Sequence, residues 1–320
     1  MNILITGGSG FLGTSLIPHL KEYDIINFDV QPSSLVETKN GFSNKRVLKK
    51  YVEWADIIIH MASKNGVGES EFKPVDTIQR NIILTTMLYE ELLHYNNKNI
   101  ILPSSTQVYG EGKHFCTNCK NFVKNPIRDY EKFNSFECFC PNCHTQLKVF
   151  KNNENDLTNP LNIYSISKLY QENIFWKLRS KHKVKILRFP IVYGKEQLKS
   201  GSYSGLIGTL VNKAKKNEDI TLCEDGGIIK NLVSVDDVID GILKSLGSES
   251  NIFNIGSFKH LSLLEIADTI IKIFNSSSKI NKDNTLNYLD SRKNMIDINK
   301  SINEIKYSPK CDFSEELKKF

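Results

Sequence analysis

A tyrosine and a lysine four residues apart are the side chains of this sequence best suited to acid–base chemistry. Tyr164 and Lys168 would share one face of a helix, because four residues make about one helical turn. A phenol with an ordinary pKa of about 10 is a poor base at neutral pH. An ammonium held beside it stabilises the phenolate and lowers that pKa. Ser105, at the end of an apolar run, offers a further hydroxyl to the same chemistry.

A glycine-rich turn near the N-terminus has the context of a loop that binds phosphate groups. The apolar run Asn2–Thr6 predicts a strand and Thr14–Glu22 predicts a helix, and the turn between them reads Gly7-Gly8-Ser9-Gly10-Phe11-Leu12-Gly13. Glycines let the backbone approach a pyrophosphate, and the N-terminus of the helix supplies N–H donors. The alternative is an ordinary turn between a strand and a helix.

Asp29 predicts which dinucleotide this loop would bind. It lies at the end of the next predicted strand, Asp24–Val30, about twenty residues past the glycines. A carboxylate at this position accepts hydrogen bonds from the adenosine ribose hydroxyls and repels a 2′-phosphate. The pattern therefore favours NAD over NADP, and the alternative is an aspartate exposed to solvent.

Two Cys-x-x-Cys pairs indicate a structural zinc site. Cys116 and Cys119 form one pair, and Cys140 and Cys143 form the second pair twenty residues further on. Four thiolates at this spacing are typical of a zinc ribbon, whose tetrahedral zinc has no open position. Cys138 and His144 flank the second pair as alternative ligands, and a redox disulfide is the competing interpretation. We expect aromatic side chains to fill the small core of the ribbon, namely Phe115, Phe122, Phe133, Phe136 and Phe139.

The composition is that of a globular protein rather than of a membrane or nucleic-acid-binding chain. The 320 residues can bury a full core, and the net charge of +6 is spread along the chain without one dominant block. No apolar run approaches the ~20 residues of a membrane span. Five of the seven cysteines are clustered, which indicates a metal site in a reducing compartment. We expect a cytoplasmic protein that contacts neither membrane nor nucleic acid.

The remaining periodicity predicts alternating strands and helices. Further strands are expected at Asp56–Met61, Asn99–Leu102 and Lys183–Phe189, and further helices at Val47–Trp54, Thr77–Tyr95, Asn162–Arg179 and Tyr203–Asn217. The segment from residue 31 to 44 is polar and is expected to be a loop or a short helix. Alternation of this kind predicts an α/β fold with a doubly wound parallel sheet of about seven strands.

Several motifs together resemble those of the extended short-chain dehydrogenase/reductase family, the nucleotide-sugar epimerases and dehydratases, in particular the UDP-galactose 4-epimerases. The resemblance covers most of the chain and rests on segments 6–13, 60–62, 104–110, 160–168, 188–194 and 233–237. It implies a Rossmann-like NAD-binding domain (1–190 and 231–258) and a smaller C-terminal substrate-binding domain (191–230 and 259–320). The cysteine segment, 112–150, is an insertion into this plan.

The resemblance also implies roles for individual residues. The catalytic set would be Tyr164, Lys168 and Ser105. The residues implied to bind NAD are Gly7, Gly10, Phe11, Leu12, Gly13, Asp29, Met61, Ala62, Ser63, Asn81, Ser104, Tyr164, Lys168 and Pro190. The substrate, a nucleotide-diphosphate sugar, would contact Thr106, Lys230 and Arg292, with Lys230 in the place of the family's arginine. A homodimer formed through helices Thr77–Tyr95 and Asn162–Arg179 is the implied assembly.

The residues at the two positions that follow Ser105 limit which reaction of this family we expect. Dehydratases of this family carry an Asp-Glu pair there, and decarboxylases carry a glutamate at the second position, whereas this chain has Thr106 and Gln107. Neither side chain can act as a general acid or base. A 4-epimerase acting through a transient keto sugar is therefore expected, with a nucleotide-sugar 4-dehydrogenase or ketoreductase as the alternative. A different class of function would be an NAD-binding, non-catalytic protein that uses the ribbon to contact a partner. In an enzyme the ribbon should instead stand at the rim of the substrate cleft.

Overall fold

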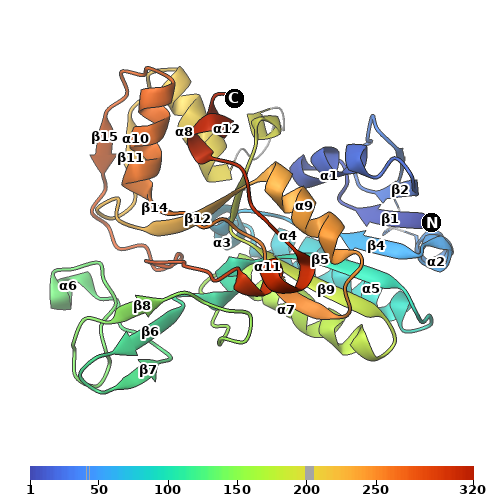
Figure 1. Ribbon diagram of the computed structural model, residues 1–320, viewed down its shortest axis with the longest axis horizontal. Coiled ribbons are helices and arrows are strands. Elements are labelled where there is room, and N and C mark those ends of the chain that lie inside the picture. Colours follow the sequence, from blue (N-terminus) through green and yellow to red (C-terminus); the bar gives the residue numbers. More distant parts are fainter. Residues whose placement is uncertain (41, 43, 199–204) are drawn as a thin grey trace.

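The computed structural model describes residues 1–40, 42, 44–198 and 205–320, and it shows three parts (Figure 1). A large sheet with helices on both faces holds the N-terminus. A smaller lobe of short strands and helices contains the C-terminus, and a ribbon of three short strands projects below that lobe. Among the described residues, none of the helices combines the length and the apolar character needed to cross a membrane.

The large sheet confirms the predicted doubly wound fold. In the described chain it has seven parallel strands in the order β3-β2-β1-β4-β5-β9-β13. The order reverses between β1 and β4, which is where such sheets bind ligands at the carboxyl ends of their strands. The strands are β1 (Asn2–Thr6), β2 (Asp24–Phe28), β3 (Glu37–Lys39), β4 (Ile57–His60), β5 (Asn99–Ser105), β9 (Lys183–Phe189) and β13 (Asn251–Asn254).

Successive residues of the central strand supply two separate cores. Ile3 and Ile5 of β1 point to one face and Leu4 points to the other, as the period of a strand requires. The first face is covered by α1 (Phe11–Leu16), α9 (Val235–Ser245) and α11 (Asn299–Ile305). The second face is covered by α2 (Lys45–Trp54), α5 (Leu84–Leu92) and α7 (Ile163–Lys177). Strands buried on both faces explain the nearly continuous apolar runs of the sequence.

Local details differ from the sequence-based expectations at three places. The helix expected at Thr14–Glu22 begins already at Phe11, and after Leu16 it becomes a 3₁₀ turn, η1 (Ile17–His19), which contains Pro18. The polar segment after Val30 contains the short edge strand β3, whose three charged or polar residues carry no strand pattern. The helix expected from Thr77 is preceded by α3 (Val67–Phe72) and α4 (Pro74–Thr77), and it passes through a π-helical turn, η2 (Ile78–Ile83), before α5.

The smaller lobe is built around its own core. β10 (Ile191–Tyr193) and β14 (His260–Ser262) flank β12 (Ile229–Ser234), and β11 (Ile220–Leu222) pairs with β15 (Ile280–Lys282). Helices α8 (Gly205–Lys215), α10 (Leu263–Ile273) and α12 (Phe313–Leu317) pack against these strands. The start of the helix expected at Tyr203–Asn217 lies outside the described residues. β12 pairs with β10 and β14 in this lobe, and the chain returns to the large sheet at β13.

The insertion is a separate small sheet closed over the cysteines. β7 (Asn121–Val123) and β8 (Lys148–Phe150) pair antiparallel with β6 (Lys113–Cys116), and the short helix α6 (Tyr130–Phe133) follows β7. Its buried residues include Cys116, Cys138, Cys140 and Leu147, which form one cluster, and also His114 and Phe136. The expected aromatic core is wrong for Phe122, which is 56% exposed and packs edge-on against Phe115 and Phe150 on the outside. Phe136 is buried as expected, and Phe115, Phe133 and Phe139 are partly buried.

Candidate functional site

Helix α7 delivers the two residues on which the predicted chemistry depends. Its N-terminus is fixed by a capping box, in which Asn162 accepts the Ser165 N–H and Ser165 accepts the Asn162 N–H. Tyr164 therefore lies in the first turn and is partly buried, and Lys168 lies one turn later and is buried. The helix packs against β5 and against the 3₁₀ turn η3 (Thr106–Tyr109) that follows it. This packing brings the Tyr-x-x-x-Lys motif to the strand end that carries Ser105.

The Lys168 ammonium is held at the end of β5. Its Nζ donates to the Pro103 carbonyl at 2.8 Å and to Gln171 Oε1 at 3.0 Å. Burial disfavours the charged form and lowers the pKa of Lys168 to about 8, against the attraction of Glu172. Ser105, two residues beyond Pro103, accepts the Gln107 N–H at 3.2 Å. The Lys168 ammonium and the Ser105 hydroxyl thus both lie near the end of β5.

A buried chain of hydrogen bonds joins this lysine to the glycine loop. Gln171 Nε2 donates to Thr85 Oγ1 at 2.8 Å, and Thr85 contacts His60 Nε2 at 2.8 Å. His60 Nδ1 contacts Thr6 Oγ1 at 2.7 Å, and Thr6 accepts the Ala62 N–H at 3.1 Å. The sequence analysis did not predict this network. The sequence features that could have indicated it are Thr6 and His60, each of which ends an apolar strand. Burial, and next the nearby Lys168 charge, lower the pKa of His60 to about 3, so the ring is neutral.

Asn81 holds the loop after β4 against α7. Its Oδ1 accepts the Lys64 N–H at 2.6 Å, and its Nδ2 donates to the Lys64 carbonyl and to Ser167 Oγ. It lies in the π-helical turn η2, and such turns occur frequently at functional sites. Met61, Ala62 and Ser63 belong to the same loop, at the carboxyl end of β4 beside β1.

The glycine loop contains two positions, Gly7 and Gly13, where a side chain would clash with the backbone, and one, Gly10, where it would not. Gly7 has φ +75°, and a Cβ there would lie 2.6 Å from the Ala62 nitrogen. A Cβ at Gly13 would lie 2.4 Å from Gly8 Cα. At Gly10 the nearest atom to a Cβ is the Gly7 carbonyl oxygen, at 3.4 Å. The chain itself therefore does not require glycine at position 10, and this open backbone fits the close approach of a diphosphate.

Asp29 stands beside that loop. Its carboxylate accepts the Ser9 N–H at 3.0 Å and the Gln31 N–H at 3.1 Å, which fixes it at the end of β2. Phe11 and Leu12 open α1, where they are partly buried and pack against the core of the first face, and their predicted cofactor contact stays a prediction. Together with Gly10, the carboxylate makes a fit for a dinucleotide, with the diphosphate at the loop and the adenosine ribose at Asp29.

Ser104 belongs to a buried ionic group behind the strand end. Its hydroxyl donates to Glu172 Oε1 at 2.5 Å, and Glu172 also forms a salt bridge with Arg188 at 2.7 Å. Arg188 donates further to the Tyr109 hydroxyl at 2.9 Å, and that hydroxyl donates to Asn254. Both ions are satisfied by several partners, as burial of a charged pair requires. These contacts fix Ser104 in place and leave its predicted cofactor contact as a prediction.

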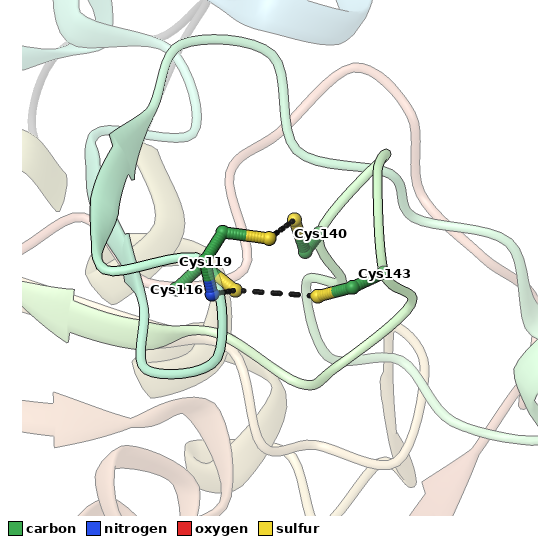
Figure 2. A group of neighbouring side chains, drawn as sticks. All are labelled: Cys116, Cys119, Cys140 and Cys143. Carbon is green, nitrogen blue, oxygen red and sulfur yellow. Dashed lines mark hydrogen bonds between the residues drawn. The ribbon is translucent and has the colours of Figure 1, made fainter.

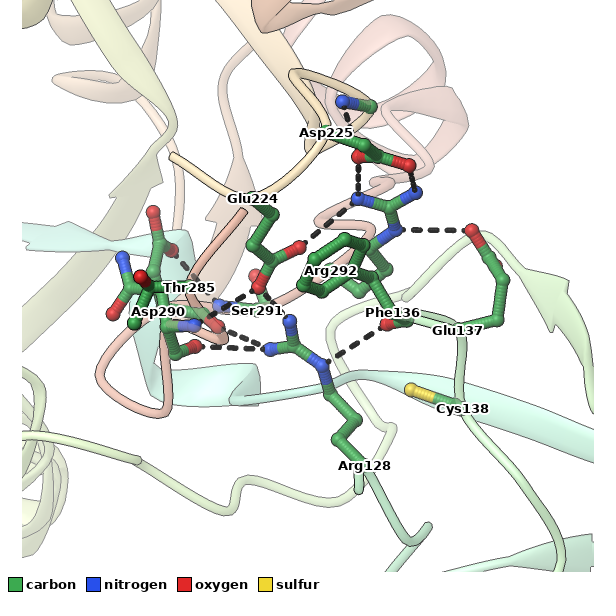
Figure 3. Close-up of polar contacts among 12 residues, drawn as sticks. Arg128, Phe136, Glu137, Cys138, Glu224, Asp225, Thr285, Asp290, Ser291 and Arg292 are labelled. Atoms are coloured by element: carbon green, nitrogen blue, oxygen red, sulfur yellow. Dashed lines mark hydrogen bonds and ion pairs between the residues drawn. The ribbon is translucent and has the colours of Figure 1, made fainter. Parts of the chain in front are cut away.

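The residues predicted for the substrate lie on the lobe side of the same strand end. The Thr106 carbonyl accepts Asn294 Nδ2 at 3.1 Å, and Lys230 Nζ pairs with Asp290 at 2.5 Å. Arg292 directs its guanidinium to Asp225, Glu137 and Glu224, as Figure 3 shows. Both cations are thus already paired with carboxylates. Pro190 joins β9 to β10 next to Gly256.

The four predicted cysteines form one cluster (Figure 2). Their sulfur atoms all lie within 4.8 Å of one another, with Cys116 Sγ 3.4 Å from Cys143 Sγ and Cys119 Sγ 3.8 Å from Cys140 Sγ. In tetrahedral zinc with Zn–S bonds of about 2.3 Å, the sulfur atoms are about 3.8 Å apart. A disulfide needs about 2.05 Å, and all seven cysteines of the described chain are free. The donor set fits zinc.

Cys138 and His144, the alternative zinc ligands expected from the sequence, lie outside this cluster. Cys138 Sγ donates to Glu111 Oε2 at 3.6 Å, and His144 Nε2 contacts Lys132 Nζ at 3.1 Å. Burial, assisted by the negative charge of Glu111, raises the pKa of the Cys138 thiol. Cys138 is therefore a neutral core residue beside the site.

Comparisons with known proteins agree with one another. The model of the NAD dependent epimerase/dehydratase family matches residues 3–133 and 133–256. The dTDP-L-rhamnose 4-epimerase of Burkholderia thailandensis is 28% identical over 295 residues, covering 84% of this chain and 80% of the relative. The UDP-glucose 4-epimerase of Thermotoga maritima, solved with UDP-glucose, superposes with a TM-score of 0.81 at 23% identity, over 99% of this chain and 96% of that one. The UDP-glucuronic acid 4-epimerase of Bacillus cereus, solved with UDP-glucuronic acid and NAD, superposes with a TM-score of 0.78 at 23% identity, also over 99% of this chain and 96% of that one.

The neutral state of buried His60 predicts how stability depends on pH. Between its ordinary pKa of about 6.5 and the lowered value of about 3, the unfolded chain binds a proton that the folded chain does not. The free energy of unfolding should therefore fall as the pH decreases below 6.5, by up to about 1.4 kcal/mol per pH unit from this group. Urea denaturation from pH 7 to pH 4.5 measures the slope.

His60→Gln removes the titrating group while keeping a side chain that can both donate and accept. The variant should be less stable at pH 7 but should lose less stability on acidification than the wild type. Equal slopes in the two proteins would show that His60 does not titrate on unfolding.

Proposed function

Since the chain belongs to the NAD-dependent epimerase/dehydratase family, we propose that it is an NAD-dependent nucleotide-sugar epimerase that acts at C4 through a transient keto sugar. The observation that supports this most directly is the meeting of α7 with β5, where the buried Lys168 ammonium lies beside the strand end that carries Ser105. Gln107 in place of an acid or base supports epimerisation over dehydration and decarboxylation.

NAD is the proposed cofactor. Gly10 would admit its diphosphate, Asp29 would accept its adenosine ribose hydroxyls, and Lys168 would hold the nicotinamide ribose. The loop of Met61, Ala62 and Ser63, fixed by Asn81, would line the dinucleotide between β1 and β4. When bound, the nicotinamide accepts a hydride from the sugar carbon and later returns it.

In the proposed mechanism Tyr164 is the base. As a phenolate it takes the proton of the sugar hydroxyl, while the Ser105 hydroxyl donates a hydrogen bond to the same oxygen. The Lys168 ammonium stabilises the phenolate electrostatically, and its burial makes this interaction stronger than it would be in water. The neutral His60 network contributes no competing charge and keeps Gln171 oriented toward Lys168.

The nucleotide-diphosphate sugar would lie between the strand end and the lobe. Thr106 would contact its sugar, and Lys230 and Arg292 would contact its phosphates. Each of these cations is paired with carboxylates, so a phosphate would share or replace anionic partners already present. A lysine ammonium has three donors and can hold a carboxylate and a phosphate together.

We further propose that the four cysteines bind a structural zinc ion. The sulfur separations support this, as does the size of the insertion, since a segment this short buries too little surface to fold without a metal. Free thiols throughout the described chain support a reducing, cytoplasmic location.

A homodimer is the proposed assembly. Large apolar side chains are exposed on neighbouring helices of one face, namely Phe72 of α3, Val75 of α4, Ile78 and Ile83 of η2, and Ile166 of α7. Exposed apolar clusters of this kind are typical of protein–protein contacts. A second copy of the same helices would cover them.

Tyr164→Phe tests the reaction. The wild type, incubated with a panel of UDP- and dTDP-hexoses, should convert at least one of them to its C4 epimer, as read by NMR, with no change of mass in mass spectrometry. Tyr164→Phe should lower that rate by about 10²–10⁴-fold while NAD still binds, because only the base is removed. Tyr170→Phe is the matched control. Tyr170 lies on α7 like Tyr164, and its hydroxyl is hydrogen-bonded to Thr86 of α5, so this variant should retain the rate. Full activity of Tyr164→Phe would refute the assignment, and oxidised or reduced sugars would identify a dehydrogenase or ketoreductase.

Cys116→Ser tests the metal. Purified wild type should contain about one zinc per chain, and the variant should contain much less and should unfold at a lower temperature, because one tetrahedral ligand is lost. Cys311→Ser, outside the cluster, should keep the metal. Elemental analysis and thermal melts give both readouts, and zinc-free wild type with an intact ribbon would contradict the proposal.

Ile83→Glu and Ile166→Glu test the assembly. Each places a charge in the exposed apolar face, so both should shift the protein from dimer to monomer in analytical ultracentrifugation. Phe258→Glu changes an equally exposed residue outside that face and should leave the dimer intact. A dimer unaffected by either isoleucine change would place the interface elsewhere.

A further inference from the structure

The three-stranded sheet of the ribbon has a buried face and a solvent-facing one, and the ribbon projects from the rest of the molecule (Figure 1). In β6 the side chains of His114 and Cys116 are buried, and Lys113 and Phe115 point to the opposite side, because successive residues of a strand alternate. Residues paired directly across antiparallel strands share a face. The pairs that include Lys113 or Phe115 define what we call the outer face, which consists of Lys113, Phe115, Phe122, Lys148 and Phe150.

Three aromatic rings of the outer face form one cluster that is open to solvent. The ring centroids of Phe115, Phe122 and Phe150 lie 5.2–6.2 Å apart, and Lys113 Nζ lies 5.1 Å from the centroid of the Phe122 ring. Phe122 is 56% exposed and Phe150 is 45% exposed. Contiguous exposed apolar groups rimmed by polar residues mark interaction sites. The outer face therefore has the composition of a surface that a partner covers.

A pocket of about 280 Å³ lies beside these rings. Its apolar walls come from the turn after β5, from β7 and from the segment before α7, namely Tyr109, Phe122, Val123 and Leu157. Tyr109 is a fixed wall, because its hydroxyl is held by Arg188 and Asn254. Apolar cavities of about 150 Å³ bind benzene. The pocket is therefore large enough to receive a leucine or an aromatic side chain.

The charges around the pocket and the outer face are positive where they are not already compensated. In the lining of the pocket, Lys113 pairs with Asp156 at 2.6 Å, and Glu111 pairs with Arg128 at 2.8 Å. Lys124 lines the same pocket and is exposed. Strands β6, β7 and β8 contain no carboxylate. Exposed lysines of the ribbon that form no ion pair within the described chain include Lys120, Lys124 and Lys148. An anionic partner would complement this surface.

The arrangement of the rings distinguishes between two kinds of anionic partner. Single-stranded nucleic acid binds by stacking its bases on the faces of aromatic rings. Here each of the three rings is turned by 70–76° from the other two, so together they form a compact apolar cluster and not a flat platform. An apolar side chain flanked by carboxylates needs only the pocket and the lysines. The geometry therefore favours an acidic peptide over a nucleic acid.

We propose that the outer face of the ribbon and its pocket bind an acidic segment of a partner protein. The segment places a leucine or an aromatic side chain in the pocket and carboxylates beside Lys124 and Lys148. The proposal concerns the insertion and not the pair of Tyr164 and Lys168, so it goes beyond the proposed reaction and does not depend on it.

The first experiment selects binders without assuming a particular partner. A random peptide library displayed on phage is panned against the immobilised full-length protein. The enriched peptides should carry a net negative charge and a leucine or an aromatic residue. Enrichment of basic or uncharged peptides, or no enrichment at all, would overturn the proposal.

The second experiment locates the binding surface. The dissociation constant of an enriched peptide is measured by fluorescence anisotropy, and Phe122→Ser and Lys124→Glu should each raise it at least about tenfold. Phe258→Ser and Lys21→Glu change an exposed apolar residue and an exposed lysine outside the ribbon, so both should bind as the wild type does. Added salt should weaken wild-type binding, because exposed charges are screened.

Zinc content and melting temperature check that the variants stay folded, and both should remain at wild-type values. If Phe122→Ser loses zinc, Lys124→Glu decides alone, because it changes only an exposed side chain, and an unchanged dissociation constant in it would overturn the proposal.

Two further outcomes would assign the outer face to another occupant and thereby overturn the proposal. One is tighter binding of a labelled single-stranded oligonucleotide than of the enriched peptide, lost in Phe122→Ser, which would identify a nucleic-acid surface. The other is a shift from dimer to monomer in sedimentation of Phe122→Ser, which would show that a second copy of the chain covers the face.

Discussion

The burial of the Lys168 ammonium is the constraint on which the arrangement of the candidate site depends. A charge taken out of water must be compensated by several well-placed partners, and here the Pro103 carbonyl and Gln171 supply them. Gln171 in turn is oriented by Thr85 and His60, whose ring is kept neutral by burial. Removing any of these groups would leave a polar atom unpaired in the interior. The requirement therefore couples α7, β5, β4 and β1, which are the elements that a bound dinucleotide would also contact.

A second group of buried charges joins the ribbon to the C-terminal lobe. Arg128 from the insertion and Arg292 from the lobe share Glu224, which is fully buried between them. Breaking one partner of such a pair typically costs about 3–5 kcal/mol, because the remaining charge stays buried. The insertion is thus not a mobile appendage of the fold. The ion pairs therefore tie the insertion that carries the cysteines to the loop that carries Arg292.

Sequence reasoning located helix α7 with its Tyr-x-x-x-Lys motif, the glycine loop and the four cysteines, because each is defined by local spacing. It misjudged elements whose state depends on distant partners. The edge strand β3 forms by pairing with β2, and Phe122 packs against Phe115 and Phe150 on the outside of the ribbon. The π-helical turn at Asn81 has no sequence signature in this chain, since it is set by contacts with Lys64 and Ser167.

The sequence by itself determined the parallel α/β fold, the family, the candidate base Tyr164 and the cysteine cluster, because hydrophobic periodicity and short motifs depend on residues close in the chain. The tertiary structure decided which charged side chains pair with one another. Asp290 meets Gln107, and Arg292 meets Asp225 and Glu137, across separations of 183, 67 and 155 residues. No periodicity encodes such contacts. They arise when the lobe and the ribbon pack together, and burial then forces each charge to find a partner.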